Sequence, residues 1–200
     1  MKIIVIGAGG TIGKEVSVEL AKRHDVVTAG RSDGQVTVDI GDPASIKEMY
    51  KSVEELDAVV CVAGEAKWES LANLSDEDFY VGIRSKLMGQ VNLVRIGIDH
   101  LNKGGSFTLT TGILAEDPVP NTTSAAMVNG GLHSFVKAAA LELGNGLRVN
   151  AVASGLVEAS ADKYRNVFPG HIPVPMDRMT AAYVRSVDGR GNGEIIRVYG

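Results

Sequence analysis

The chain has 200 residues, of which 44% are hydrophobic, and its formal net charge at pH 7 is -4. This length is sufficient for one domain with a sizeable core, while the weakly acidic balance argues against a nucleic-acid or membrane partner. No apolar run approaches the roughly 18 residues of a membrane span. The single cysteine, Cys61, cannot form an internal disulfide and is expected to be buried. Together these features predict a soluble cytoplasmic protein.

The first predicted element is a buried strand that runs into a glycine-rich turn. Residues 3–6 are β-branched, as in a parallel strand covered on both faces, and residues 11–22 follow as a helix. Such a turn places bare backbone N–H groups at a positive helix end, where a diphosphate binds. Glycine is needed because a Cβ would block the ligand. The alternative is an ordinary strand-to-helix turn. The predicted dinucleotide site comprises Gly7, Gly9, Gly10, Thr11, Ile12 and Gly13.

Strands and helices alternate along the rest of the chain, as a parallel sheet requires. The predicted strands are 26–30, 36–40, 57–62, 106–111, 147–152 and 194–199, and the predicted helices start at Pro43, after Ser75, at Ser124 and at Met176. Only residues 31–35 join the second strand to the third, so we expect a bare loop there. We predict an α/β fold with one doubly wound NAD(P)-binding Rossmann-type domain over residues 1–200. Its parallel sheet should have about seven strands in the order 3-2-1-4-5-6-7, with helices on both faces.

The end of the second predicted strand bears on the choice between the two nicotinamide dinucleotides. In doubly wound folds this position meets the adenosine ribose, where an acid selects NAD and an arginine accommodates the 2′-phosphate of NADP. Arg31 and Ser32 stand there, and the nearest acid, Asp33, comes later. A guanidinium and a hydroxyl both suit a phosphate. The sequence therefore favours NADP over NAD, the alternative being a solvated surface arginine.

Four blocks of the sequence resemble the short-chain dehydrogenase/reductase family, and they extend over nearly the whole chain. They are IGAGGTIG at residues 6–13, Val38-Asp39-Ile40, Val62-Ala63-Gly64, and LRVNAVASG at residues 147–155, which follows the family-like ALEL of residues 140–143. The resemblance implies that Asp39 contacts adenine. It adds Ile40, Ala63, Gly64, Gly155 and Val157 to the expected cofactor-binding residues.

The resemblance also implies four catalytic positions, of which one is conservatively changed here and the other three carry unrelated residue types. The family uses a Tyr-x-x-x-Lys pair, in which the tyrosine protonates the substrate oxygen. Counting back from residues 140–143 places Ala125 at the tyrosine position and Asn129 at the lysine position. The family serine falls on Thr111, which keeps a hydroxyl, and the family asparagine falls on Lys86. This chain is therefore interpreted as an atypical member that lacks the pair.

A different proton donor is expected, because general acid–base help is worth about 10²–10⁴-fold in rate. Lys86 is the first candidate, since a lysine buried beside a cofactor can have a lowered pKa; it could equally pair with a phosphate or carboxylate. Thr111 is the second predicted catalytic residue, although it could simply hydrogen-bond locally. His133 lies one turn after Asn129 on the same predicted helix. We expect His133 at the helix surface or in a subunit contact.

The proline-rich segment 158–175 is predicted to be rich in loops. In relatives this region covers the substrate. Tyr164, Phe168 and His171 from this segment are therefore candidate pocket residues, together with Trp68 after the fourth strand. A plain surface excursion is the alternative.

The helices expected at residues 75–101 and 124–143 are apolar around most of their circumference, more than burial on one face requires. We expect them to pack against symmetry copies in a homodimer or homotetramer, as in relatives. Two functions remain open. The first is an NADP-dependent oxidoreductase that acts on a small-molecule carbonyl or alcohol through a non-standard proton-delivery site. The second is a catalytically silent NADP(H)-binding sensor or regulatory protein.

Overall fold

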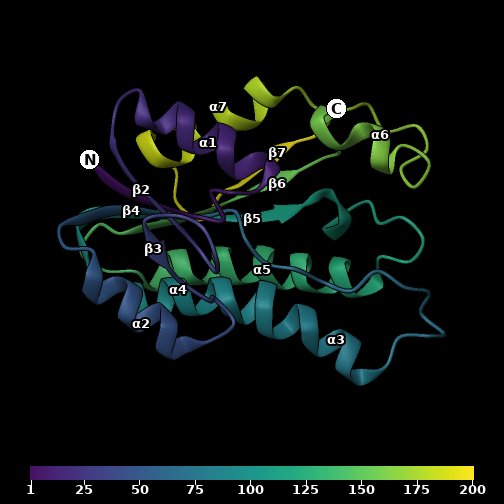
Figure 1. Ribbon diagram of the computed structural model, residues 1–200, viewed down its shortest axis with the longest axis horizontal. Helices are drawn as coiled ribbons and strands as arrows, with labels where there is room; N and C mark the ends of the chain where they lie inside the picture. Colours follow the sequence, from purple (N-terminus) through teal and green to yellow (C-terminus); the bar gives the residue numbers. More distant parts are fainter.

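A parallel sheet of seven strands runs through the middle of the computed structural model, which describes residues 1–200 (Figure 1). The strands lie side by side in the order β3-β2-β1-β4-β5-β6-β7, and all pairings are parallel. This order confirms the predicted doubly wound topology. In chain order the strands are β1 (Lys2–Ile6), β2 (Asp25–Gly30), β3 (Val36–Thr37), β4 (Leu56–Cys61), β5 (Leu101–Gly112), β6 (Arg148–Ser154) and β7 (Ile195–Val198).

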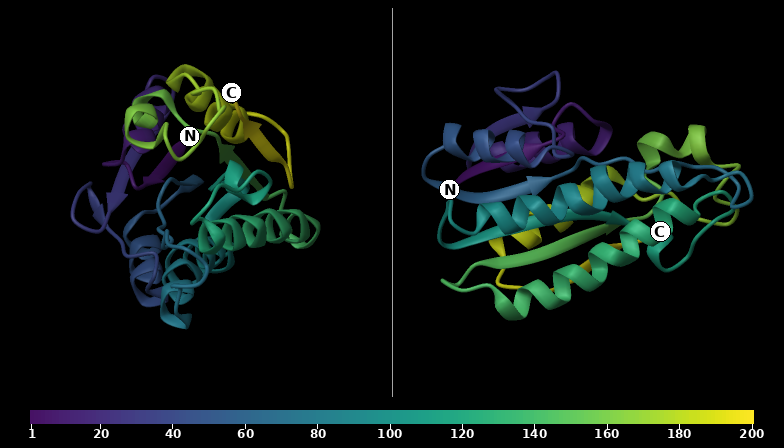
Figure 2. Two further views of the ribbon diagram at one scale, coloured as in Figure 1. Left: turned by 90° about the vertical axis from the view of Figure 1, so that its right-hand side faces the viewer. Right: turned by 90° about the horizontal axis from the view of Figure 1, so that it is seen from below.

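Helices cover both faces of the sheet, and Figure 2 shows the two layers from the side and from below. On one face lie α1 (Thr11–Ala21) and α7 (Met176–Asp188); on the other lie α2 (Pro43–Ser52), α4 (Gly89–Gly97) and α5 (Thr123–Glu142). Helix α3 (Asp76–Gly82) reaches α4 through a π-helical turn, η1 (Ile83–Met88). The remaining short elements are the 3-10 turns η2 (Ile113–Ala115) and η3 (Glu158–Ser160) and the helix α6 (Ala161–Tyr164).

Two helices begin at the residues that the sequence indicated. Asp42 caps α2, since its carboxylate accepts a hydrogen bond from the Ala44 N–H, and Pro43 occupies the first turn. Ser75 and Asp78 cap α3 reciprocally in a capping box. The helical stretch that starts here ends at Gly97 rather than near residue 101, because Leu101 pairs with Leu56 and already belongs to β5.

The edge strand β3 is shorter than predicted and ends at Thr37. The backbone turns towards α2 at Asp39, whose N–H donates to Ser45 Oγ and whose carboxylate accepts from the Gly41 N–H. Residues 31–35 form a bare loop between β2 and β3, as expected.

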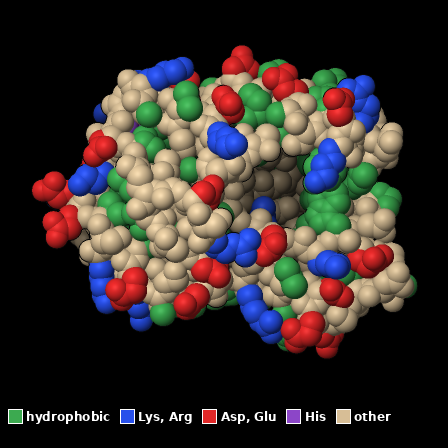
Figure 3. Space-filling view, viewed as in Figure 1, with side chains coloured by type: hydrophobic (Ala, Val, Ile, Leu, Met, Phe, Trp, Pro, Cys, Tyr) green, Lys and Arg blue, Asp and Glu red, His purple; other side chains and the backbone are tan.

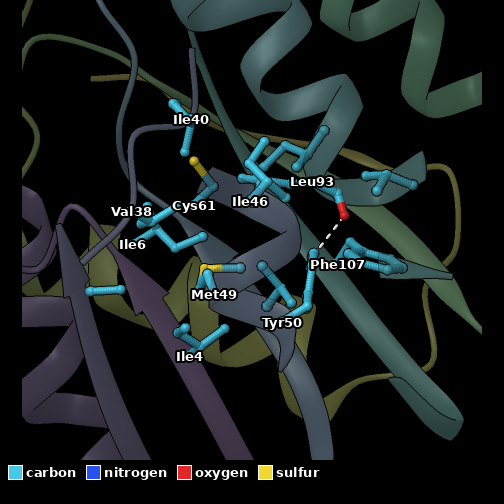
Figure 4. Close-up of a cluster of buried hydrophobic side chains, with 14 of the residues drawn as sticks. Ile4, Ile6, Val38, Ile40, Ile46, Met49, Tyr50, Cys61, Leu93 and Phe107 are labelled. Carbon is cyan, nitrogen blue, oxygen red and sulfur yellow. Dashed lines mark hydrogen bonds between the residues drawn. The ribbon is translucent and has the colours of Figure 1, made fainter. Parts of the chain in front are cut away.

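Two apolar layers hold the sheet between its helices. The layer beneath α2, α4 and α5 includes Tyr50, Leu93 and Phe107, and the Tyr50 hydroxyl donates to the Leu93 carbonyl over 2.7 Å (Figure 4). Cys61 belongs to this layer and is fully buried, as predicted, which raises its thiol pKa to about 11. The layer beneath α1 and α7 includes the buried Tyr183. In the whole chain, no helix combines the length and the apolar character that crossing a membrane needs.

Candidate cofactor and active-site cleft

Three adjoining cavities lie along the carboxyl ends of the central strands, and a hollow is visible on this face in Figure 3. Their volumes are about 350, 460 and 290 Å³. In open α/β sheets this edge is where ligands bind. Every residue that the sequence placed in the cofactor or catalytic site lines at least one of these cavities.

The glycine turn between β1 and α1 forms the floor of the first cavity. Gly7 has a φ of +83° and donates its N–H to the Ala29 carbonyl over 2.8 Å, so the turn lies against β2. A Cβ on Gly13 would stand 2.0 Å from the Gly7 carbonyl oxygen, so only glycine lets α1 start this close to the turn. The N-terminus of α1 therefore faces a turn whose own residues carry no bulky side chains, and such a turn suits a phosphate.

The far side of the first cavity is polar and carries charges of both signs. Arg31 and Ser32 line it, and the Arg31 guanidinium lies 3.7 Å from the Glu65 carboxylate. Asp33, the nearest acid to the end of β2, also lines this cavity, and its carboxylate fills the space that a Cβ on Gly9 would need. The close approach follows from the bare loop 31–35, which folds back over the glycine turn.

The chain after β4 separates the first cavity from the second. Gly64 adopts a φ of +118°, and a Cβ there would lie 2.9 Å from the Cα atom of Lys86. Because Gly64 has no side chain, η1 can pack against the end of β4. Lys86 lines the second and third cavities from η1, and burial lowers its pKa, with Cys61 acting in the opposite sense.

The second cavity has an aromatic wall built from two distant segments. The Trp68 ring lies 5.6 Å from that of Tyr164 and 6.2 Å from that of Phe168, measured between centroids. These three predicted pocket residues do line the cavity. His171 does not line it; this ring packs edge-on behind Phe168, with centroids 5.2 Å apart.

Ala125 and Asn129 line the second cavity from α5, one turn apart. Asn129 is 3% exposed, and its Oδ1 atom accepts no hydrogen bond from the chain. An unpaired buried acceptor is costly, so a donor from a bound molecule would stabilise the site. The sequence could not reveal this unpaired oxygen, because it depends on which groups surround Asn129 in the fold.

The expectation for His133 was wrong in one respect: this side chain is not at the helix surface. His133 is 7% exposed, and its Nε2 atom lies 2.8 Å from the Thr111 hydroxyl at the end of β5. On the other side of the ring, Nδ1 lies 3.6 Å from Glu116, whose carboxylate accepts three hydrogen bonds from Arg197. The signal in the sequence was the spacing of four residues from Asn129, which places both side chains on one face of α5.

Three comparisons relate this chain to known proteins. The family model described as Enoyl-(Acyl carrier protein) reductase matches residues 11–175. Versicolorin reductase stcU of Emericella nidulans is 28% identical over 195 residues, which covers 85% of this chain and 73% of that protein. Trihydroxynaphthalene reductase of Colletotrichum orbiculare is 28% identical over 198 residues, covering 85% and 68%.

Solved structures agree with the sequence relatives. The crystal structure of the protein lin1944 from Listeria innocua superposes with a TM-score of 0.98 at 48% identity over 100% of both chains. A small-chain dehydrogenase in complex with NADPH has a TM-score of 0.87 at 27% identity, over 99% of this chain and 96% of that one. Fold and cleft are those of a Rossmann-type protein. More specifically, the chain belongs to the short-chain dehydrogenase/reductase family.

Proposed function

We propose that this protein is an NADP(H)-dependent oxidoreductase that acts on a carbonyl or alcohol group of a small molecule. The observation that carries the proposal is the joining of two sites in one cleft. A cradle of glycines, with Arg31 at its edge and the Asp33 carboxylate over Gly9, leads directly to a cavity that holds Thr111 and Lys86. The NADPH complex of a family member and the reductase names of the relatives support the same reading.

The residues of the cleft fit the cofactor. The glycine turn offers N–H groups to a diphosphate, beside the Asp33 carboxylate that lies over Gly9, and Arg31 with Ser32 offers donors to a 2′-phosphate. Asn129 Oδ1 offers its free acceptor to a donor in the second cavity, such as a hydroxyl. Bound there, NADP(H) would donate or accept a hydride. The proposed cofactor-binding residues are Gly7, Gly9, Gly10, Thr11, Ile12, Gly13, Arg31, Ser32, Asp39, Ile40, Ala63, Gly64, Gly155 and Val157.

The second cavity favours a substrate with a flat or apolar body. Ten of its 19 lining residues are hydrophobic, and Trp68, Tyr164 and Phe168 form one wall. Aromatic side chains stack on flat rings. The relatives' names, versicolorin and trihydroxynaphthalene reductases, are compatible with such a substrate class.

Two side chains in this cavity can assist proton transfer to a substrate oxygen. The Thr111 hydroxyl can donate a hydrogen bond, and the Lys86 ammonium can stabilise negative charge or give up a proton, because its pKa is lowered. We propose that these two residues take the place of the family's tyrosine and lysine, whose positions in α5 carry Ala125 and Asn129.

NADPH consumption tests the proposal directly. We expect turnover with at least one member of a panel of aromatic ketones and quinones, together with cofactor-dependent quenching of Trp68 fluorescence. Thr111→Ala and Lys86→Ala should each lower kcat by about 10²-fold or more. Lys67→Ala is the matched control, since Lys67 is exposed and lines none of the three cavities.

A catalytically silent NADP(H)-binding sensor is the second candidate, and the alanine at position 125 favours it because a methyl group cannot protonate an alkoxide. Tight NADPH binding without turnover of any panel compound would support the sensor and contradict the enzyme. Turnover that falls in the Thr111 or Lys86 variant would do the opposite.

We also propose that the protein assembles as a homodimer or homotetramer through its long helices. Exposed apolar side chains lie along them: Tyr80, Val81, Met88, Ile98, Met127 and Leu141. Leu141 on α5 is 88% exposed, and a contact between subunits would bury it. Light scattering after gel filtration measures the mass, and a single mass of 21.1 kDa at micromolar concentration would contradict the proposal.

A further inference from the structure

A line of polar contacts leads from the second cavity to the protein surface. Thr111 lines the cavity and is 3% exposed; its hydroxyl oxygen lies 2.8 Å from His133 Nε2. His133 Nδ1 in turn faces Glu116 Oε1 at 3.6 Å, and the Glu116 side chain is 35% exposed. The line therefore starts at the proposed reaction site, passes through buried groups and ends in solvent.

Glu116 is fixed in place from the other side. The Arg197 guanidinium donates to both carboxylate oxygens, over 2.9 and 2.6 Å, and the Tyr199 hydroxyl donates to Oε2 over 3.4 Å. The carboxylate lies 3.6 Å from Nδ1, slightly beyond hydrogen-bond distance, and its negative charge favours a proton on that nitrogen. The arrangement is that of a hydroxyl, an imidazole and a carboxylate in series.

We propose that His133 supplies and removes the proton of the reaction, acting through the hydroxyl of Thr111. This inference rests on the proposed function and deepens it by naming the proton source. His133 would serve as the partner of Thr111, because Ala125 and Asn129 stand at the positions of the family's tyrosine and lysine. Lys86 then contributes charge beside the substrate rather than the transferred proton.

Atoms and charges balance in both directions. For reduction, the Nε2–H bond of the His133 imidazolium breaks as Thr111 Oγ1 gains that proton, and Thr111 passes its own proton to the substrate oxygen. The imidazole that remains is neutral and keeps its proton on Nδ1, facing Glu116. For oxidation, each proton moves the opposite way. The cofactor exchanges the hydride and its electron pair with the substrate, and solvent protons recharge the imidazole.

Charged groups from three elements act on His133. Glu116, after η2, raises the imidazole pKa, while Arg197 of β7 and Lys137 of α5 lower it. Burial is the largest influence, and the resulting pKa lies below the ordinary value of 6.5. His133 should thus be neutral at pH 7, which suits a base for alcohol oxidation, and carbonyl reduction should speed up at acid pH.

Steady-state pH profiles in both directions separate this role from a structural one. His133→Gln keeps a side-chain amide that can hydrogen-bond to Thr111 but cannot ionise in this range. We expect kcat to fall about 10²-fold or more and the pH limb near the imidazole pKa to disappear, with KM and the NADPH dissociation constant changed by less than threefold. His100→Gln is the control, because His100 is exposed, stacks on Tyr50 of α2 and lines none of the three cavities.

Variants of Thr111 test whether the two residues act as one unit. Thr111→Val should remove the same pH limb, and Thr111→Ser should restore it. The double variant His133→Gln/Thr111→Val should cost no more than either single change, since a broken relay cannot be broken twice. Additive losses, or an unaltered pH profile in His133→Gln, would overturn the inference while leaving the proposed oxidoreductase standing.

A measurement that needs no turnover completes the test. Side-chain NMR of the cofactor-free protein should show His133 titrating below 6.5 as the Nδ1–H tautomer, with Glu116→Gln lowering the pKa further because Arg197 then acts unopposed. An Nε2–H tautomer, or a normal pKa unaffected by Glu116→Gln, would contradict the relay. Binding of NADPH without any turnover by the wild-type protein would instead contradict the proposed function, and the relay with it.

Discussion

The guanidinium of Arg31 lies 3.7 Å from the carboxylate of Glu65, across the mouth of the first cavity. Their side chains are 66% and 59% exposed, so solvent screens this pair and it contributes little stability. A 2′-phosphate could displace Glu65, because the planar guanidinium binds phosphate through parallel hydrogen bonds. We therefore expect the pair to open if NADP(H) binds.

Replacement of Arg31 by alanine should weaken NADPH binding about 10- to 100-fold and leave NADH binding within about threefold, given the strength of charge-assisted hydrogen bonds. Titration calorimetry with both cofactors measures the difference. Arg190→Ala serves as the control, since Arg190 is exposed after α7 and lines none of the three cavities. An equal loss of affinity for both cofactors would show that Arg31 does not read the 2′-phosphate.

The glycine cradle predicts a sharp contrast between two neighbouring substitutions. A Cβ on Gly13 would lie 2.0 Å from the Gly7 carbonyl oxygen and 2.8 Å from its carbon, and backbone atoms cannot move aside cheaply. We expect Gly13→Ala to lower the free energy of unfolding by about 1–3 kcal/mol. Urea denaturation without ligand measures it.

Gly10→Ala is the matched control for that experiment. Gly10 has a φ of -76°, which any residue adopts, and a Cβ there would stand 3.4 Å from the Gly7 oxygen. Its unfolding free energy should stay within about 0.5 kcal/mol of the wild type. Equal destabilisation by the two alanines would mean that the tight approach of α1 to the turn is not what requires glycine at position 13.

Helix α4 offers a second case in which glycine permits close packing. A Cβ on Gly97 would lie 2.5 Å from the Tyr50 hydroxyl and 2.7 Å from the Phe107 ring, in the layer shown in Figure 4. Alanine normally favours a helix over glycine by about 1 kcal/mol. Here the clash should dominate, and Gly97→Ala should destabilise the protein by about 1–3 kcal/mol in urea denaturation.

Removal of the Tyr50 hydroxyl should relieve part of that clash. Tyr50→Phe alone loses the hydrogen bond to Leu93 and should cost about 1 kcal/mol. Combined with Gly97→Ala, it should cost less than the sum of the two single changes. Strict additivity would show that the methyl group and the hydroxyl do not meet.

Much of the fold could be predicted because its signals are local. The β-branched run of β1, the glycines after it, Asp42 before Pro43 and the Ser75–Asp78 capping box each report on a few adjacent residues. The alternation of strands and helices then indicates a parallel sheet with helices on both faces. The order of the strands, confirmed in the structure, depends on the same alternation.

The contacts within the cleft could not be predicted in the same way, because they join residues far apart in the chain. Thr111 meets His133 across 22 positions, and Glu116 meets Arg197 across 81. No local pattern encodes either pairing. The carboxylate of Asp33 over Gly9 likewise depends on how a loop without regular structure folds back. The roles assigned to the cleft residues remain predictions.

Because Cys61 is buried, the rate at which its thiol reacts with a reagent reports on the packing of the layer beneath α2 and α4. Desolvation raises the thiol pKa to about 11, so at pH 8 about one thiol in a thousand would be thiolate even if reagents could reach it. The thiol also donates a weak hydrogen bond to the Ala63 carbonyl over 3.7 Å, at the edge of the cofactor cleft. We expect Ellman's reagent to label the folded protein at pH 8 only as fast as the core opens, and to label the chain unfolded in about 6 M guanidinium, above the roughly 5 M midpoint that marks a hyperstable domain, within seconds. Bound NADPH should slow the labelling of the folded protein, because a ligand stabilises the closed state. Complete labelling of the native protein within the mixing time would contradict this packing of β4.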